Sequence, residues 1–337
     1  MNFREDTERS RDYKQRYADG LNELIVSRRN AAASKRKVYS KDILTNREAY
    51  VDDLKEMLGW PMTERIQIGA PKVRSEMLAQ ESGFSIHRMS FEILDGVEMT
   101  GLYFRMDSDE KKPLVLVQHG GKGSPEHISG IYGDTTNYNR MLERVISCGA
   151  HAFAPQLLLW DQDKCGVCYD RWEMDAALKR VGSSIAAVEL YGLIRILDYF
   201  ETLNEVSSFG MVGLSYGGFY TLLLSAVDTR IRSAISCAFF NTRDKYPWCD
   251  FTWLRSAEKF DDAEIACLVY PRKLCIEIGQ KDQIFDSEYA IRSYGRIKEI
   301  CADISLDWLS FIQFDGEHEF CKIDDPIRNL INDISGK

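Results

Sequence analysis

Hydrophobic and polar residues follow two different rhythms along the chain. Up to about residue 60, apolar residues recur at helical spacing among many charges, as in 46–58 (NREAYVDDLKEML), and the sequence GWP at 59–61 ends that helix. From residue 84, apolar and polar residues alternate as in strands over 84–94 and 97–106, and an Asp-Gly pair between them predicts a hairpin turn. The pattern therefore predicts a helical N-terminal region followed by β-structure.

After the hairpin, short apolar segments alternate with longer segments of helical periodicity. Strands are expected over 113–119, 150–156, 207–214, 232–239, 273–279 and 309–314, and helices over about 137–148, 182–203, 287–301 and 319–333 and from about 216. Short strands joined by helices form a mostly parallel sheet with helices on both faces, and the hairpin adds antiparallel strands at one edge. We therefore expect an α/β fold with an eight-stranded sheet.

The composition restricts the classes of partner. The chain has 337 residues, 45% of them hydrophobic, which suffices for one large core and an appendage. A formal net charge of -9 disfavours nucleic acid and anionic membranes as partners. The first 20 residues are densely charged, and no segment approaches the roughly 18 apolar residues of a membrane helix. We expect a cytoplasmic protein without a membrane partner.

The nine cysteines favour a set of reduced thiols over a disulfide framework, because their number is odd and they are scattered through expected strands and helices. Cys165 and Cys168 form one C-x-x-C pair, but no second pair or nearby histidine completes four zinc ligands. We expect neither a metal nor an organic cofactor.

A G-x-S-x-G motif, GLSYG at 213–217, lies where the strand 207–214 ends and a helix begins. A serine on such a sharp turn projects beyond the carboxyl edge of the sheet, and the flanking glycines let strand and helix approach each other. The helix N-terminus supplies free N–H groups for a developing oxyanion. Ser215 is therefore the expected nucleophile.

Two further residues follow strands at the same edge. Asp282 comes three residues after the strand 273–279, and His318 lies in the loop after the last strand. The order Ser, Asp, His is the order of the catalytic triad in a fold of this kind. His318 would accept the serine proton, and Asp282 would orient the imidazole. Asp286 is the rival acid, but its position suits the N-cap of the next helix.

The loop after the strand 113–119 has the sequence HGGKG at 119–123, and it is expected to supply part of an oxyanion hole. We assign the two donors to the backbone N–H groups of Gly121 and of Tyr216, the residue after the nucleophile. His119 precedes the glycines of the loop, and we expect it to be a structural hydrogen-bonding residue.

With these motifs the chain resembles the α/β-hydrolase superfamily, and within it the branch of dienelactone hydrolases and acetyl xylan esterase-like enzymes, with prolyl oligopeptidase-type relatives. The resemblance covers about 85–330 and rests on HGG at 119–121, GLSYGG at 213–218, DTRIRSAISC at 228–237, YPRKLCIEIGQKDQIFD at 270–286 and GEHEF at 316–320. It implies the triad Ser215, Asp282 and His318. A serine nucleophile departs from the cysteine of dienelactone hydrolases proper.

On this basis we expect residues 1–80 to form an N-terminal helical extension and 81–337 to form the catalytic domain. Insertions over about 157–180 and 240–266 lie at the catalytic edge. Their aromatic residues form either a small core or the wall of a substrate pocket; they include Trp160, Trp172, Trp248 and Trp253. Arg171 and Arg243 are candidates for binding a substrate carboxylate.

The expected activity is hydrolysis of a small carboxylic ester, such as an O-acetylated sugar or another acylated metabolite, through an acyl-enzyme on Ser215. A small-peptide peptidase or amidase and an acyltransferase could use the same triad. A non-catalytic binding module is disfavoured because all three triad members are present. The N-terminal helices are candidates for contacts in a homo-oligomer.

Overall fold

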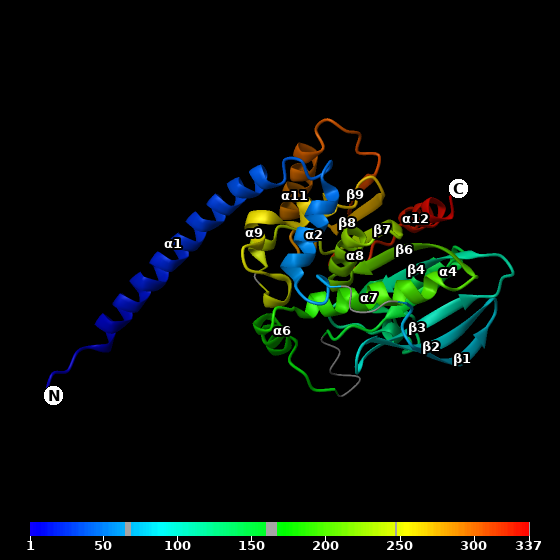
Figure 1. Cartoon of the computed structure of the whole chain (residues 1–337). Helices are drawn as coiled ribbons and strands as arrows, with labels where there is room; N and C mark the ends of the chain where they lie inside the picture. Colours follow the sequence, from blue (N-terminus) through cyan, green and yellow to red (C-terminus); the bar gives the residue numbers. More distant parts are fainter. Residues whose placement is uncertain (65–68, 160–166, 247, 337) are drawn as a thin grey trace.

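A single mixed sheet organises the chain in the computed structural model, which describes residues 1–64, 69–159, 167–246 and 248–336 (Figure 1). The strands are β1 (Val73–Glu81), β2 (Phe84–Leu94), β3 (Val97–Met106), β4 (Lys112–Gln118), β5 (His151–Pro155), β6 (Val206–Leu214), β7 (Ile231–Cys237), β8 (Lys273–Gly279) and β9 (Leu309–Phe314). Their order across the sheet is β1-β2-β3-β5-β4-β6-β7-β8-β9.

The strands β4 to β9 all run parallel, while β1, β2 and β3 pair antiparallel at one edge, where β3 joins β5. The hairpin of β2 and β3 matches the expected strands residue for residue, and the turn lies at the expected Asp-Gly pair. Since the parallel strands end at the same edge of the sheet, the loops that follow β4, β6, β8 and β9 can meet there.

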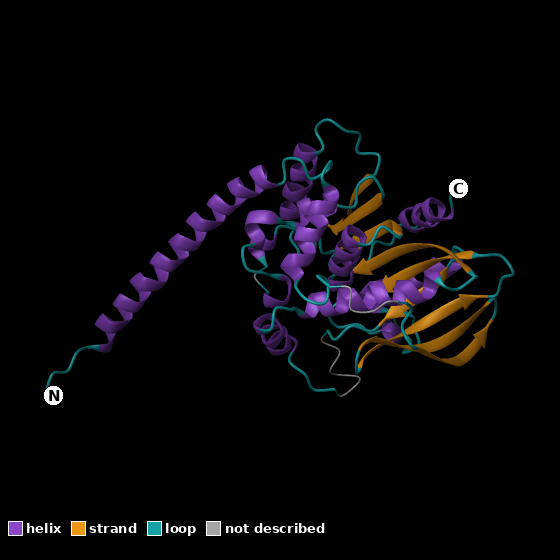
Figure 2. Cartoon of the chain, viewed as in Figure 1, coloured by secondary structure: helices purple, strands orange, loops and turns teal. Residues whose placement is uncertain are grey.

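Helices cover both faces of the sheet, as Figure 2 shows. The longer ones after the hairpin are α4 (Met141–Ser147), α6 (Arg171–Arg180), α7 (Ile185–Glu201), α8 (Tyr216–Val227), α10 (Asp262–Cys267), α11 (Ser287–Ile300) and α12 (Asp325–Ser335). The buried apolar side chains form two clusters, one with α4 and α12 and the other with α7, α8, α10 and α11. The expected α/β architecture is therefore confirmed.

The structure corrects three local expectations. The sheet has nine strands rather than eight, because residues 73–81, which we placed in the helical extension, form the edge strand β1. Most side chains of β1 are exposed on both faces, so its sequence lacks the alternation of a half-buried strand. The last helix begins at Asp325 rather than near residue 319, with Pro326 in its first turn. The first insertion contains the helix α6, which we did not predict.

The N-terminal helix α1 (Thr7–Tyr39) extends away from the rest of the chain, whereas α2 (Arg47–Leu58) packs on the core (Figure 1). Only the end of α1 is fixed, through contacts with the short helix α9 (Ser256–Lys259) and with α10 and its N-cap. No helix within the described residues combines the length and the apolar character needed to cross a membrane.

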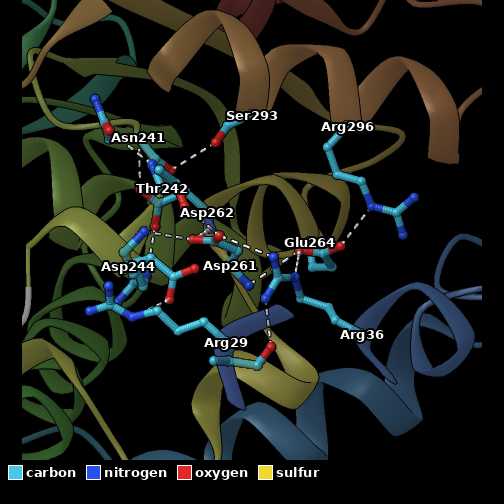
Figure 3. A network of polar contacts seen from close by, with 12 residues as sticks. Arg29, Arg36, Asn241, Thr242, Asp244, Asp261, Asp262, Glu264, Ser293 and Arg296 are labelled. Atoms are coloured by element: carbon cyan, nitrogen blue, oxygen red, sulfur yellow. Dashed lines mark hydrogen bonds and ion pairs between the residues drawn. The ribbon is translucent and has the colours of Figure 1, made fainter. Parts of the chain in front are cut away.

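Arg36 anchors the end of α1 through buried carboxylates (Figure 3). Its guanidinium lies 3.3 Å from Asp261 Oδ2 and 3.3 Å from Glu264 Oε2 and donates to the carbonyl of Ala257 at 2.5 Å. Arg296 of α11 donates to the other oxygen of Glu264 at 3.0 Å. Because Glu264 is fully buried, these two cations compensate a carboxylate that would otherwise be costly to bury.

Glu277 is a buried acid on β8, the strand next to the edge strand β9. Burial is the largest influence on its carboxyl group and raises the pKa to about 7. Since this folded-state pKa is above the ordinary value of 4.5, the protonated form is favoured in the folded chain. The contribution of Glu277 to the stability of the folded chain is therefore fully present below pH 4.5 and is lost as the pH rises through about 7.

Replacing Glu277 by Gln is expected to flatten the pH dependence of stability. Between pH 4.5 and pH 8.5 the free energy of unfolding of the wild-type chain should fall by up to about 3 kcal/mol, whereas Glu277→Gln should not show this fall. Urea unfolding across this pH range measures the difference. Glu110→Gln, at an exposed acid, is the control and should reproduce the wild-type profile. Identical profiles for Glu277→Gln and wild type would show that Glu277 does not titrate in this range.

Candidate active site

Ser215 lies on the tight turn between β6 and α8, as the motif predicts. Its backbone has φ 59° and ψ -122°, a conformation that residues with a side chain rarely adopt. The amide of Ser215 donates to the carbonyl of Cys237 at the end of β7 at 2.9 Å, which fixes the turn against the neighbouring strand. Such strain at a serine is typical of a nucleophile turn.

The glycines around Ser215 are required by close backbone contacts. A Cβ atom on Gly213 would lie 2.3 Å from the carbonyl oxygen of Gly217, and one on Gly217 would lie 2.2 Å from that of Gln118. A Cβ atom on Gly218 would lie 2.8 Å from the carbonyl oxygen of Cys237. The motif therefore lets α8 begin directly against the ends of β4 and β7.

His318 and Asp282 form a hydrogen-bonded pair. His318 Nδ1 lies 2.8 Å from Asp282 Oδ2, and the other carboxylate oxygen accepts the backbone N–H groups of Ile284 and Phe285 at 2.8 and 2.9 Å. Asp282 is buried, and the ring of Phe285 stacks on His318 at 5.8 Å. Because Nδ1 faces a carboxylate, it carries the proton, and Nε2 keeps a free lone pair.

Backbone contacts hold the loop that carries His318. A Cβ atom on Gly279 would lie 2.3 Å from the carbonyl oxygen of Glu317, so the loop packs directly on the end of β8. Asn137, in the short helix η1 (Thr136–Tyr138), donates to the carbonyl of His318 at 2.9 Å. Asn137 was missed in the sequence because it lies in a segment that we expected to begin a regular helix. Asp286 caps α11, as expected for the rival acid.

The loop after β4 is fixed by His119. Its Nε2 accepts the amide of Leu157 at 3.1 Å, so the proton resides on Nδ1, which donates to the carbonyl of Gly120 at 2.9 Å. The amide of Gly120 in turn donates to the hydroxyl of Tyr138 at 2.9 Å. The expectation that His119 is a structural hydrogen-bonding residue is confirmed, since both ring nitrogens bind backbone groups.

One cavity of about 730 Å³ brings these elements together. Ser215 and His318 line it with the two expected oxyanion residues, Gly121 and Tyr216. The other lining residues are Gly120, Lys122, His127, Thr136, Asn137, Tyr138, Trp172, Leu214, Trp248 and Ile284. Within the described part of the chain, no cluster of three or more His, Cys, Asp or Glu side chains suits a metal ion.

Some aromatic residues of the insertions line the cavity, and others pack in the core. Trp172 of α6 and Trp248 line the cavity, and Trp248 stacks on the ring of Tyr216 at 6.0 Å with an interplanar angle of 5°. Trp253 is not among the lining residues, and its ring packs against the core between Lys179 and Arg243. The prediction that Trp253 lines the substrate pocket is therefore wrong. Trp160 lies outside the described residues.

Arg171 is fully buried and holds the two insertions together, contrary to the expectation that it could bind a substrate carboxylate. It donates from Nε to Asp250 Oδ2 at 2.7 Å and from both terminal nitrogens to Glu189 at 3.1 and 3.0 Å. Asp250, in the short helix η3 (Cys249–Phe251), accepts the hydroxyl of Tyr216 at 3.0 Å. Tyr220 of α8 donates to Glu189.

Arg243 has a similar structural role. Its Nε donates to Asp262 Oδ1 at 2.8 Å and its Nη1 to the carbonyl of Phe251 at 3.0 Å. Both guanidinium groups therefore have buried protein acceptors, which the sequence could not reveal, because the acids are far from the arginines along the chain.

No protein-family model and no curated protein matches this chain. Solved structures are similar to it. A proposed acetyl xylan esterase from Bacteroides fragilis has 16% identity and a TM-score of 0.63 over 86% of this chain and 82% of the other. A glucuronoyl esterase from Solibacter usitatus has 13% identity and a TM-score of 0.60 over 87% and 93%. An acetyl xylan esterase from Paenibacillus sp. R4 has 15% identity and a TM-score of 0.59 over 87% and 94%. The chain has the α/β-hydrolase fold of these enzymes.

Arg171→Met is expected to destabilise the folded chain by about 3–5 kcal/mol, because it leaves two buried carboxylates without their cation. Urea unfolding followed by tryptophan fluorescence measures this loss. Arg255→Met is the matched control, since Arg255 pairs with Glu258 at 2.7 Å but has a side chain that is 71% exposed. The control should change the free energy of unfolding by less than about 0.5 kcal/mol. An equally small effect for Arg171→Met would contradict the structural role.

Proposed function

We propose that the protein is a serine hydrolase that cleaves a small carboxylic ester through an acyl-enzyme on Ser215. The observation that carries the proposal is the 2.8 Å contact of His318 Nδ1 with Asp282 Oδ2, because His318 lines the same cavity as the strained Ser215. A hydroxyl on a strained turn beside an oriented imidazole is the arrangement that activates serine in acyl transfer.

The first step is attack of Ser215 Oγ on the acyl carbon of the ester. His318 Nε2 accepts the hydroxyl proton, and Asp282 stabilises the imidazolium that forms. His318 then gives this proton to the alkoxide oxygen of the leaving alcohol as the carbon–oxygen bond breaks. A water molecule attacks the acyl-enzyme with His318 again as the base, which releases the carboxylic acid and restores Ser215.

The tetrahedral intermediate carries a negatively charged oxygen. We assign the hydrogen bonds that stabilise this oxygen to the backbone N–H groups of Gly121 and Tyr216. Tyr216 is the first residue of α8, where backbone N–H groups lack intrahelical acceptors. Its side chain is held by Asp250 and Trp248, so the position of its amide is well defined. Fixed donors of this kind stabilise the transition state without reorganisation.

We infer that the substrate is an acylated sugar or another acylated metabolite. The similar solved structures include acetyl xylan esterases and a glucuronoyl esterase, which supports an ester of a sugar. The cavity has room for a sugar unit, and the exposed ring of Trp172 offers a flat apolar surface for the face of a pyranose.

Ser215→Ala is expected to fold normally and to lose turnover of 4-nitrophenyl acetate by roughly 10⁴- to 10⁶-fold, as removal of a triad nucleophile does. A fluorophosphonate probe should label the wild-type protein and fail to label the variant. The control is Ser310→Ala, at an exposed serine of β9, which should label like wild type. Undiminished turnover by Ser215→Ala would refute the assignment, provided that its unfolding curve matches wild type.

We also infer that two copies of the chain associate through α1. Tyr17, Leu21 and Leu24 lie on one face of this helix, and their side chains are 72%, 42% and 55% exposed. Residues 1–40 contain ten basic and six acidic residues, while the rest of the chain is strongly acidic. Helices in proteins are stabilised mainly by tertiary packing, and the described contacts of α1 with the rest of the chain lie in its C-terminal part, so a second copy with an acidic body is a suitable partner for the remainder.

The double substitution Leu21→Glu and Leu24→Glu is expected to convert a dimer of the full chain into a monomer, because it places two negative charges in an apolar contact against an acidic partner. Light scattering coupled to size exclusion measures the mass. Val97→Glu, at the exposed first residue of β3, is the control and should leave the dimer intact. A monomeric wild-type protein at micromolar concentration would rule out this association.

A further inference from the structure

The charges around the candidate cavity have the opposite sign to the charge of the chain. The chain carries 52 acidic and 43 basic residues, but among the described residues that line the cavity none is Asp or Glu. Lys122 is the lysine of this lining, and no arginine accompanies it. The N-terminus of α8 also faces the cavity through Tyr216 and adds a partial positive charge.

The ammonium group of Lys122 has no acidic partner within the described part of the chain, since it takes part in none of the ion pairs there. The nearest acid along the sequence, Glu126, is held by Arg88 at 2.8 Å. Lys281, in the loop that carries Asp282, is paired with Asp315 at 2.5 Å. The charge of Lys122 is therefore available for a group that enters the cavity.

Lys122 directly follows Gly121, one of the two assigned oxyanion donors. Because both residues line the cavity, an anion bound to Lys122 would lie in the same cavity as the ester carbonyl. Trp172, on α6, provides an apolar surface that suits the face of the sugar ring. A negatively charged sugar would use the ammonium group, whereas a neutral sugar would leave it with water alone.

We propose that the alcohol part of the substrate is an acidic sugar, an O-acylated uronic acid whose carboxylate binds Lys122. This inference rests on the proposed ester hydrolysis at Ser215 and adds the class of alcohol that the site selects. The carboxylate takes no part in bond making; it orients the ring so that the acyl group reaches Ser215. Lys122 is therefore a specificity residue, which makes the enzyme prefer esters of acidic sugars to esters of neutral sugars.

The test compares two methyl glycosides that carry one acetyl group at the same position, a glucuronoside and a glucoside, which differ by a carboxylate in place of a hydroxymethyl group. The ratio of their kcat/KM values should favour the acidic sugar about fivefold to tenfold at low salt. Lys122→Met should reduce this ratio to about one, and Lys122→Glu should reverse it. Added salt at about 0.5 M should weaken the wild-type preference, because it screens an exposed charge.

Lys111→Met is the matched control, since Lys111 is an exposed lysine that precedes β4 at the opposite edge of the sheet. It should keep the wild-type ratio. A hemisuccinate ester of methyl glucoside places the carboxylate in the acyl part instead. A preference that depends on Lys122 for this ester and not for the glucuronoside would overturn the assignment to the alcohol part.

The two proposals fail in different ways. Equal kcat/KM values of the wild-type protein for glucuronoside and glucoside would overturn the inference about Lys122 and leave ester hydrolysis in place. A wild-type protein that hydrolyses none of these esters, 4-nitrophenyl acetate included, would overturn the proposed function, and the acidic-sugar inference would fall with it.

Discussion

The backbone at Ser215 is held in a left-handed conformation by contacts with three strands, and the geometry of the cavity depends on it. The turn is tied to β7 through the amide of Ser215, and Gly217 touches the backbone at the end of β4. Any larger residue at 213 or 217 would push α8 away from the sheet, since a Cβ atom there would lie about 2 Å from a backbone oxygen. The Tyr216 amide would then move together with Ser215.

A buried ion pair network holds α8 from its other side. Arg171 connects the first insertion to Glu189 of α7 and to Asp250 of the second insertion, and Asp250 binds the side chain of Tyr216. The insertions are thus joined to each other and to α8, the helix that follows Ser215. Trp172, next to Arg171, is placed over the cavity by the same helix α6. The walls of the cavity and the turn that carries Ser215 are therefore one connected structure.

The sequence predicted where the three proposed catalytic residues lie better than it predicted their surroundings. Ser215, Asp282 and His318 could be assigned because each follows an apolar strand, and parallel strands must end at one edge. The edge strand β1 was missed because its exposed side chains show no alternation. The true partners of Arg171 lie 18 and 79 residues away, so the sequence alone made it a substrate-binding candidate. Trp253 was misplaced because an aromatic residue in an insertion suits a core and a pocket equally well.

The roles proposed in substrate selection and in oxyanion stabilisation fall on one loop, the loop after β4. His119 and Tyr138 fix its backbone at Gly120, and the following two residues face the cavity, one with the assigned oxyanion donor and one with a cation. The carboxylate of Asp282 is buried and accepts hydrogen bonds from His318 and from two backbone N–H groups, which stabilise its charge. Among the described residues no acid lines the cavity, so an acidic chain can present a cavity lined by a cation. In such a cavity a short displacement of the loop would change the affinity for an anionic substrate and the stabilisation of the oxyanion together.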